Sequence, residues 1–153
     1  MTPDRLAPTD PRLPETLDLM RACFAYMAGV IDPPSSLERM DIAELRAAAA
    51  RSELWVWGTP VKACVLLTPK EDCLYLGKLA VAEAARGQGL SRRIVAFATE
   101  RAADLQLAAL ELQTRVELTQ NHHVFKALGF VESGRDAHAG YARPTSITFR
   151  KPL

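Results

Sequence analysis

The sequence lacks an excess of charge of either sign. Its 153 residues include 19 lysine and arginine residues against 18 aspartate and glutamate residues, which gives a formal net charge of +1. A chain this close to neutrality has no overall field that would attract it to nucleic acid or to an anionic membrane. We therefore expect no nucleic-acid partner and no membrane partner, and any anion site must be local.

Long hydrophobic runs and paired cysteines are also absent. No stretch approaches the ~20 apolar residues that span a bilayer, and the N-terminal segment lacks the apolar region of a signal peptide. These absences predict a cytoplasmic protein. Cys23, Cys64 and Cys73 form an odd set without CxxC or metal-ligand spacing, so we expect reduced packing residues rather than disulfides.

The chain has no internal division that would mark a second domain. It contains no repeat, no low-complexity tract and no break in composition. Its 48% of hydrophobic residues can supply one core. We therefore expect residues 1–153 to form a single domain.

Hydrophobic periodicity predicts the order of the elements. Asp10 is the expected N-cap of an amphipathic helix that ends at Gly29. The elements expected after it are a helix over 37–51, strands over 54–58, 61–67 and 74–81, a helix over 90–105, a strand over 109–116, a helix over 121–128, and strands over 130–135 and 145–150. Short connections make the first three strands antiparallel, whereas the intervening helix makes strands 74–81 and 109–116 parallel. The fold class is a mixed α/β sheet.

The segment RGQGLS (86–91) has the composition of an anion site. Gly87 and Gly89 allow positive φ and close approach of a ligand, and the amides up to Ser91 lie at the free N-terminus of the next helix. Arg86 adds a forked cation suited to phosphate. A solvated glycine-rich connection is the alternative interpretation. A P-loop is excluded because the GK[ST] ending is missing, and a Rossmann fingerprint because Arg92 replaces its third glycine.

Two motifs together resemble the GNAT superfamily of acetyl-coenzyme A dependent N-acetyltransferases. The family's Q/R-x-x-G-x-G/A pattern is matched by Arg86 and Gly89, with Ser91 in place of the last small residue. The segment ELTQNHHVFKALGF (117–130) resembles the family's second motif, an aromatic residue followed by LGF. The chain is also similar to bacterial members that carry an H-x-G-Y-x-R-P-T segment, here 138–145.

The resemblance implies a fold and a cofactor site. The expected sheet is twisted and mostly antiparallel, with a splayed parallel pair at its centre and about four flanking helices. Pantetheine would lie between the splayed strands, the Val81 amide would polarise the thioester carbonyl, and the pyrophosphate would bind the turn. The residues implied to bind acetyl-coenzyme A are Leu79, Val81, Arg86, Gly87, Gln88, Gly89, Leu90, Ser91, Asn121 and Phe125.

The catalytic residues that the family usually carries are missing. Tyr75 stands where many members have a glutamate base, and Phe125 stands where many have a tyrosine acid. We hypothesise that His122 relays the proton of the attacking ammonium, since histidine titrates near neutrality, and that Tyr75 orders the relay. Glu117 is the alternative base, and His138 is a more remote candidate.

The acceptor pocket is implied to lie between two loops. These are residues 29–36 and 135–144, with Asp32, His138, Tyr141 and Arg143 as substrate-binding candidates. Gly77 is expected to share a strand face with Tyr75, Leu79 and Val81 and to leave room beside the reacting groups.

The resemblance favours an enzyme that acetylates the primary amine of a small molecule. A protein acetyltransferase acting on an N-terminus or a lysine is one alternative, and a non-catalytic acyl-coenzyme A binding module is another. No metal is expected, because no third ligand accompanies the adjacent His122 and His123. The sequence is compatible with a homodimer.

Overall fold

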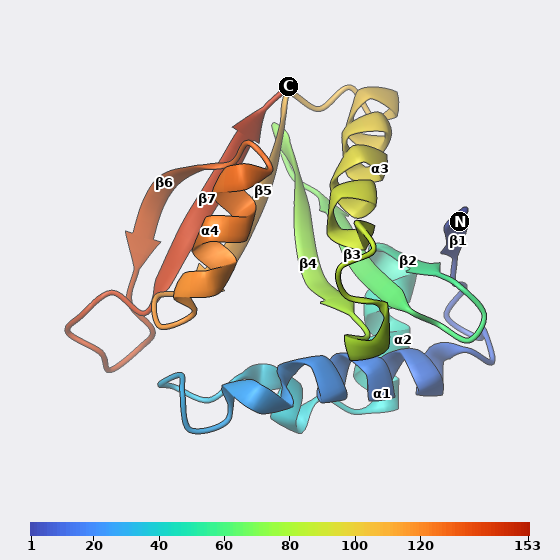
Figure 1. The fold of residues 1–153 in the computed structure, drawn as a ribbon, viewed down its shortest axis with the longest axis horizontal. Coiled ribbons are helices and arrows are strands. Elements are labelled where there is room, and N and C mark those ends of the chain that lie inside the picture. The colour runs from blue at the N-terminus through green and yellow to red at the C-terminus, as the bar shows by residue number, and fades with distance from the viewer.

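The computed structural model describes residues 1–153 and has four α-helices (Figure 1). In chain order the elements are β1 (Asp4–Arg5), α1 (Leu13–Phe24), η1 (Ala25–Met27), η2 (Ser36–Arg39), α2 (Ile42–Arg51), β2 (Glu53–Trp57), β3 (Ala63–Pro69), β4 (Cys73–Val81), η3 (Glu83–Ala85), α3 (Leu90–Asp104), β5 (Ala109–Arg115), α4 (Thr119–Ala127), β6 (Val131–Asp136) and β7 (Ser146–Pro152). None of the helices combines the length and the apolar composition that crossing a membrane requires.

The strands form a single mixed sheet. Their order is β1-β2-β3-β4-β5-β7-β6, and every neighbouring pair is antiparallel except β4–β5, which is parallel. The predicted antiparallel order of β2, β3 and β4 and the parallel pairing of β4 with β5 are confirmed, and β6 pairs antiparallel with β7. The fold class expected from the sequence is therefore correct.

The parallel pair β4–β5 is joined at one end only. Its ladder consists of Cys73↔Ala109, Leu74↔Leu110 and Tyr75↔Glu111. Beyond these pairs β4 and β5 continue without pairing to each other, and Figure 1 shows them diverging toward α1, which crosses the open end. Backbone groups that border this gap are thus free to bond a ligand.

A β-bulge interrupts β4 beside the gap. Lys78 and Leu79 together oppose a single residue of β3, Val65, where the register of the ladder shifts. Lys78 adopts the left-handed region with φ 52°, which is uncommon for a residue with a Cβ.

The bulge changes which side chains share a face of β4. Leu76 belongs to the core cluster beneath α3, and Leu79 and Val81 pack against that same cluster although they are odd-numbered. Tyr75 and Gly77 precede the bulge and point to the opposite face. The expectation that Gly77 shares a face with Leu79 and Val81 is therefore wrong, because it assumed unbroken alternation.

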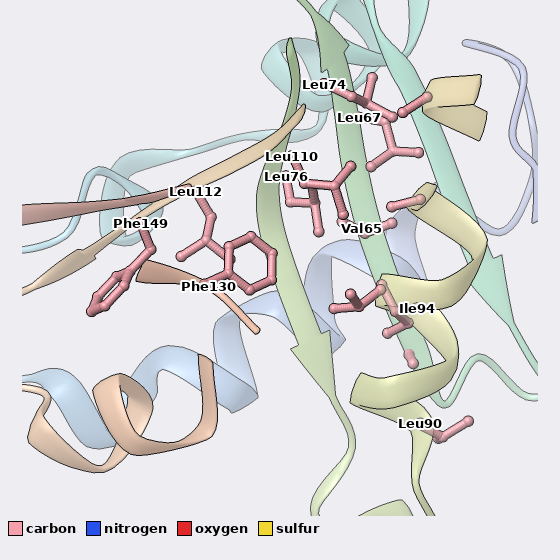
Figure 2. Close-up of a cluster of buried hydrophobic side chains, with 14 of the residues drawn as sticks. Val65, Leu67, Leu74, Leu76, Leu90, Ile94, Leu110, Leu112, Phe130 and Phe149 are labelled. Carbon is pink, nitrogen blue, oxygen red and sulfur yellow. The ribbon is translucent and has the colours of Figure 1, made fainter. Parts of the chain in front are cut away.

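Two clusters of apolar side chains hold helices on both faces of the sheet. One cluster joins α1 and α2 to β2 and β3, and its members include Leu17, Met20, Leu45, Leu54 and Val56. The other joins α3 to the opposite face, and Figure 2 shows part of it, with side chains from α3, β3, β4, β5 and β7. On that face Trp55 and Trp57 both meet the Phe97 ring edge-on, so they are sheet-packing residues.

The first two helices begin later than the sequence predicts. The α1 helix starts at Leu13, because Asp10 Oδ1 accepts the Arg12 amide at 2.8 Å in the preceding turn instead of capping the helix. The stretch 37–51 is divided into η2 and α2, since Asp41 accepts the Glu44 amide at 2.9 Å and starts a new helix there. A strong N-cap inside a periodic stretch explains the second difference.

The packing of α3 on the sheet predicts a large stability effect at Ile94. Its side chain is fully buried in the cluster shown in Figure 2, so Ile94→Ala should lower the free energy of unfolding by about 2–5 kcal/mol. Denaturant unfolding measures this. Val131→Ala on the exposed edge strand is the matched control and should change it by less than about 0.5 kcal/mol. Equal effects of the two substitutions would contradict the assigned core.

Candidate active site

The backbone amides of the turn before α3 have no hydrogen-bond acceptor within the protein. Gly87 and Gly89 have φ of 79° and 76°, and a Cβ added to either would meet no protein atom within 4 Å. None of the amides from Gly87 to Ser91 donates to a protein acceptor, and they precede or open a 15-residue helix. This arrangement suits a phosphate group, since free amides and the helix dipole both favour negative charge.

A cavity of about 580 Å³ extends from this turn along β4. Arg86 and Ser91 line its turn end, and Leu79, Asn121 and Phe125 line it farther along. Of the ten residues predicted to bind the cofactor, only Gln88 does not line this cavity; the lining is Cys23, Phe24, Tyr26, Leu79, Ala80, Val81, Ala85, Arg86, Gly87, Gly89, Leu90, Ser91, Gln120, Asn121, Val124 and Phe125. The sequence motif thus lies along one continuous cavity.

The backbone of Val81 is turned toward the gap between β4 and β5. The Ala82 amide donates to Lys62 O at 2.7 Å, which makes Ala63↔Val81 a non-hydrogen-bonded pair of the β3–β4 ladder. The N–H and C=O groups of Val81 therefore point away from β3. Its carbonyl accepts the Cys23 thiol at 3.1 Å, and burial raises the pKa of that thiol, so the thiol stays protonated.

A second cavity of about 380 Å³ lies at the other end of the gap. Phe24, Leu79, Asn121 and Phe125 line both cavities, so the two meet at these residues. The second cavity is bordered by the turn before α2 and by the diverging halves of β4 and β5, with Tyr75 and Gly77 on its wall. A ligand in one cavity would therefore face a ligand in the other.

Tyr75 enters the second cavity as a neutral phenol. Burial, and next the charge of Glu111, raise the pKa of this phenol above its ordinary value. Lys70 lies over the ring at 4.2 Å from its centroid. Tyr75 can thus donate a hydrogen bond at neutral pH but cannot serve as the base.

His122 and Glu117 do not reach either cavity. His122 Nε2 lies 2.9 Å from Arg115 O, and its ring packs against Phe149 with the centroids 5.8 Å apart. Glu117 Oε2 accepts the Asp32 amide at 3.2 Å, while its Oε1 is buried without a partner. The structure therefore does not bring these two candidates beside Tyr75, and a role for either would require an intervening group.

His138, by contrast, lines the second cavity and has a fixed orientation. Thr145 is fully buried, and its Oγ1 accepts the His138 backbone amide at 2.9 Å, contacts His138 Nδ1 and donates to Asp136 O at 3.3 Å. The single hydroxyl hydrogen of Thr145 can go to Asp136 O or to a neutral Nδ1; when Asp136 O accepts it, Nδ1 carries the ring proton and donates it to Oγ1. The lone pair of the neutral ring is then on Nε2, which makes no hydrogen bond within the protein.

The other three acceptor candidates bind one another. Tyr141 Oη donates to Asp32 Oδ1, and Arg143 lies 3.7 Å from Asp32 Oδ2 and 3.9 Å from Glu117 Oε2. The bond to Asp32 raises the pKa of Tyr141. Asp32, Tyr141 and Arg143 thus tie loop 29–36 to loop 135–144 and are not among the residues that line the cavity.

Sequence reasoning missed several residues of the second cavity. Lys78, Gln113, Ser146 and Thr68 supply polar groups to it, and Thr145 orients His138 from behind. The alternation of side chains along β5 would have predicted that Gln113 lies on the face of the cavity. The bulge interrupts this alternation in β4, so the same reasoning does not identify Lys78. The cysteines are all buried and unpaired, and no three acidic, histidine or cysteine side chains converge as metal ligands.

The chain shares its fold with solved bacterial acetyltransferases. The acetyltransferase of Streptococcus agalactiae 2603 matches with a TM-score of 0.76 at 18% identity, over 99% of this chain and 98% of that one. A GNAT family acetyltransferase of Elizabethkingia anophelis, solved with acetyl-CoA bound, matches with a TM-score of 0.70 at 17% identity, over 99% and 97%. The ribosomal-protein-S18-alanine N-acetyltransferase of Escherichia coli gives 0.70 at 19% identity, over 99% and 94%.

Comparison of sequences identifies a family but no individual relative. No curated protein matches the chain. Residues 14–130, which run from α1 through the turn before α3 to the end of the second motif, match the acetyltransferase (GNAT) family. With the fold, the free amides of the turn and the family match in agreement, the chain belongs to the GNAT family of acetyltransferases, and acetyl-coenzyme A is its cofactor.

Proposed function

We propose that the protein transfers an acetyl group from acetyl-coenzyme A to the primary amine of a small molecule. The observation that carries this proposal is the junction of the two cavities at Leu79, Asn121 and Phe125. One cavity ends at the turn before α3, whose amides have no acceptor in the protein, and the other is lined by His138. A cavity of about 380 Å³ suits a small acceptor.

The residues of the first cavity fit the cofactor. Arg86 and the amides of Gly87 to Ser91 would hold the pyrophosphate, and Asn121 and Phe125 would flank the pantetheine arm. When bound, acetyl-coenzyme A supplies an acetyl thioester, whose carbonyl carbon is the electrophile. The Val81 N–H faces the gap and would stabilise the negative charge that develops on the carbonyl oxygen, because it is held in place before the reaction.

The acceptor must lose a proton before it can attack. An alkyl amine with a lysine-like pKa of ~10.4 is neutral in only about one molecule in a thousand at pH 7. We assign proton removal to His138 Nε2, since His138 lines the acceptor cavity and its Nδ1 is already in contact with Thr145 Oγ1. Tyr75 would orient the amine or a water molecule, and its neutral phenol suits that role.

No general acid is required for the leaving group. Phe125 has no proton to give, and no other acidic side chain shares its position at the junction. A thiol with a reference pKa of ~8.5 leaves readily as the thiolate. The absence of the usual tyrosine is thus compatible with catalysis.

The proposed activity is tested by release of free coenzyme A thiol from acetyl-coenzyme A in the presence of individual amines. We expect turnover with at least one class of small amine above the rate without acceptor. Turnover with peptides alone would support a protein acetyltransferase instead. Tight binding of acetyl-coenzyme A without turnover of any amine or peptide would support a non-catalytic binding module.

The phosphate-binding role of the turn predicts a ligand-dependent effect of Arg86→Ala. Loss of a forked cation beside the pyrophosphate should weaken coenzyme A binding by about ten- to a hundred-fold, since charge-assisted hydrogen bonds contribute about 1.5–3 kcal/mol. Binding of pantetheine, which lacks the pyrophosphate, should be unchanged. Calorimetric titration measures both, with Arg46→Ala on α2 as the control. An equal loss for the two ligands would refute the pyrophosphate role.

The two histidines are distinguished by their effects on rate. His138→Ala should lower kcat by about ten- to a hundred-fold, leave acetyl-coenzyme A affinity unchanged and flatten the acidic limb of the pH–rate profile. His122→Ala is the matched control and should keep that limb, because its ring faces β5 and β7. If His122→Ala instead flattens the acidic limb and His138→Ala keeps it, the base is His122, as the sequence predicted.

A further inference from the structure

The acceptor cavity has an unbalanced charge. Its lining residues include the cations Lys78 and Arg115 but no aspartate or glutamate. We propose that the acceptor carries a carboxylate next to its amine, as an amino acid does, and that Lys78 binds this carboxylate. The inference rests on the proposed function and names the substrate class of the same site.

Lys78 is the cation of this cavity that is free to bind a ligand. It makes no ion pair with any carboxylate of the protein within 4 Å, whereas the Arg115 guanidinium already donates to Pro33 O at 2.7 Å and Pro34 O at 3.3 Å. The Lys78 side chain is half-buried, and burial lowers the pKa of its ammonium. A bound carboxylate would offset this desolvation.

The nearby carboxylates do not compete for this position. Glu44 on α2 raises the pKa of Lys78 only as a secondary influence, and it lies outside the cavity lining. Glu111 is occupied by Arg150 at 3.1 Å and by Lys70 at 3.7 Å. Asp32 lies beside Arg143 and accepts the Tyr141 hydroxyl, and Glu117 also lies beside Arg143. The protein therefore leaves the cavity without an anion of its own.

The position of Lys78 also relates it to the reacting groups. It lies on the bulge, directly before Leu79, which lines both cavities. Its left-handed backbone, with φ 52°, is a conformation that a glycine would adopt without strain. A cation at this point can hold a carboxylate while the amine of the same acceptor reaches the junction.

This charge pattern separates acceptor classes. Polyamines and other polycations would meet Lys78 and Arg115 with no carboxylate to receive them. A peptide N-terminus presents a neutral amide carbonyl where a free amino acid presents its carboxylate. We therefore expect amino acids to be preferred over both.

The test compares free amino acids with their carboxamides, each pair at an equal concentration of the neutral amine. For the preferred side chain, the wild type should show a kcat/KM at least about ten-fold higher for the acid, as a charge-assisted bond of about 1.5–3 kcal/mol predicts. Lys78→Met should abolish this ratio through the acceptor KM. Lys62→Met, a lysine outside both cavities, should preserve it. Lys78→Gly should also abolish the ratio without loss of thermal stability, which separates recognition from folding.

The possible failures are distinguishable. If no amine of any kind is acetylated, the proposed function fails. If amines are acetylated but carboxamides, peptides or polyamines are turned over as well as the acids, only the assignment of the carboxylate fails. A ratio that persists in Lys78→Met would also overturn the role of Lys78.

Discussion

The short parallel pairing of β4 with β5 is the constraint on which the rest of the site depends. Backbone donors and acceptors rarely stay unpaired in a protein interior, so two strands that part must be bridged by something else. Here the pairing ends after Tyr75↔Glu111, and the free halves border two cavities. Polar side chains brace the closed end, where Arg150 binds both Glu111 and Asp72 at 3.1 and 2.7 Å. These ion pairs therefore hold the paired end of β4–β5 together although the two strands part at the other end.

The bulge in β4 directs the side chains before it and after it to different faces of the sheet. A regular strand would direct Tyr75, Gly77, Leu79 and Val81 to one face, and the two cavities would compete for the same side chains. One extra residue reverses the alternation, so Tyr75 and Gly77 line the second cavity while Leu79 and Val81 pack toward α3. Lys78 at the bulge holds a strained backbone, and such strain is commonly stored where a functional side chain must be placed.

Apart from β1 and the division of residues 37–51 into η2 and α2, the sequence was sufficient for the order of the elements and for the cofactor motif, because both depend on local patterns. Periodicity identifies helices and strands, and the glycines of the turn before α3 signal their conformations directly. The bulge was not predicted: Gly77 in CLYLGKLAV is compatible with an irregular strand, but the sequence does not place an extra residue at Lys78. Two predicted acceptor residues, Asp32 and Arg143, form an ion pair with each other because the fold brings two distant loops together. Spacing along the chain carries no information on that contact.

The two histidines show why residue type and motif position are insufficient to assign a base. Each has one ring nitrogen in contact with a fully or partly buried oxygen. For His122 the partner is the Arg115 carbonyl, which places the proton on Nε2 and turns the ring toward Phe149. For His138 the partner is the buried Thr145 hydroxyl, and when that hydroxyl donates to Asp136 O the lone pair of the neutral ring is on Nε2. His138 also lines the same cavity as Tyr75, which His122 does not, and this difference is the basis for proposing His138 as the base.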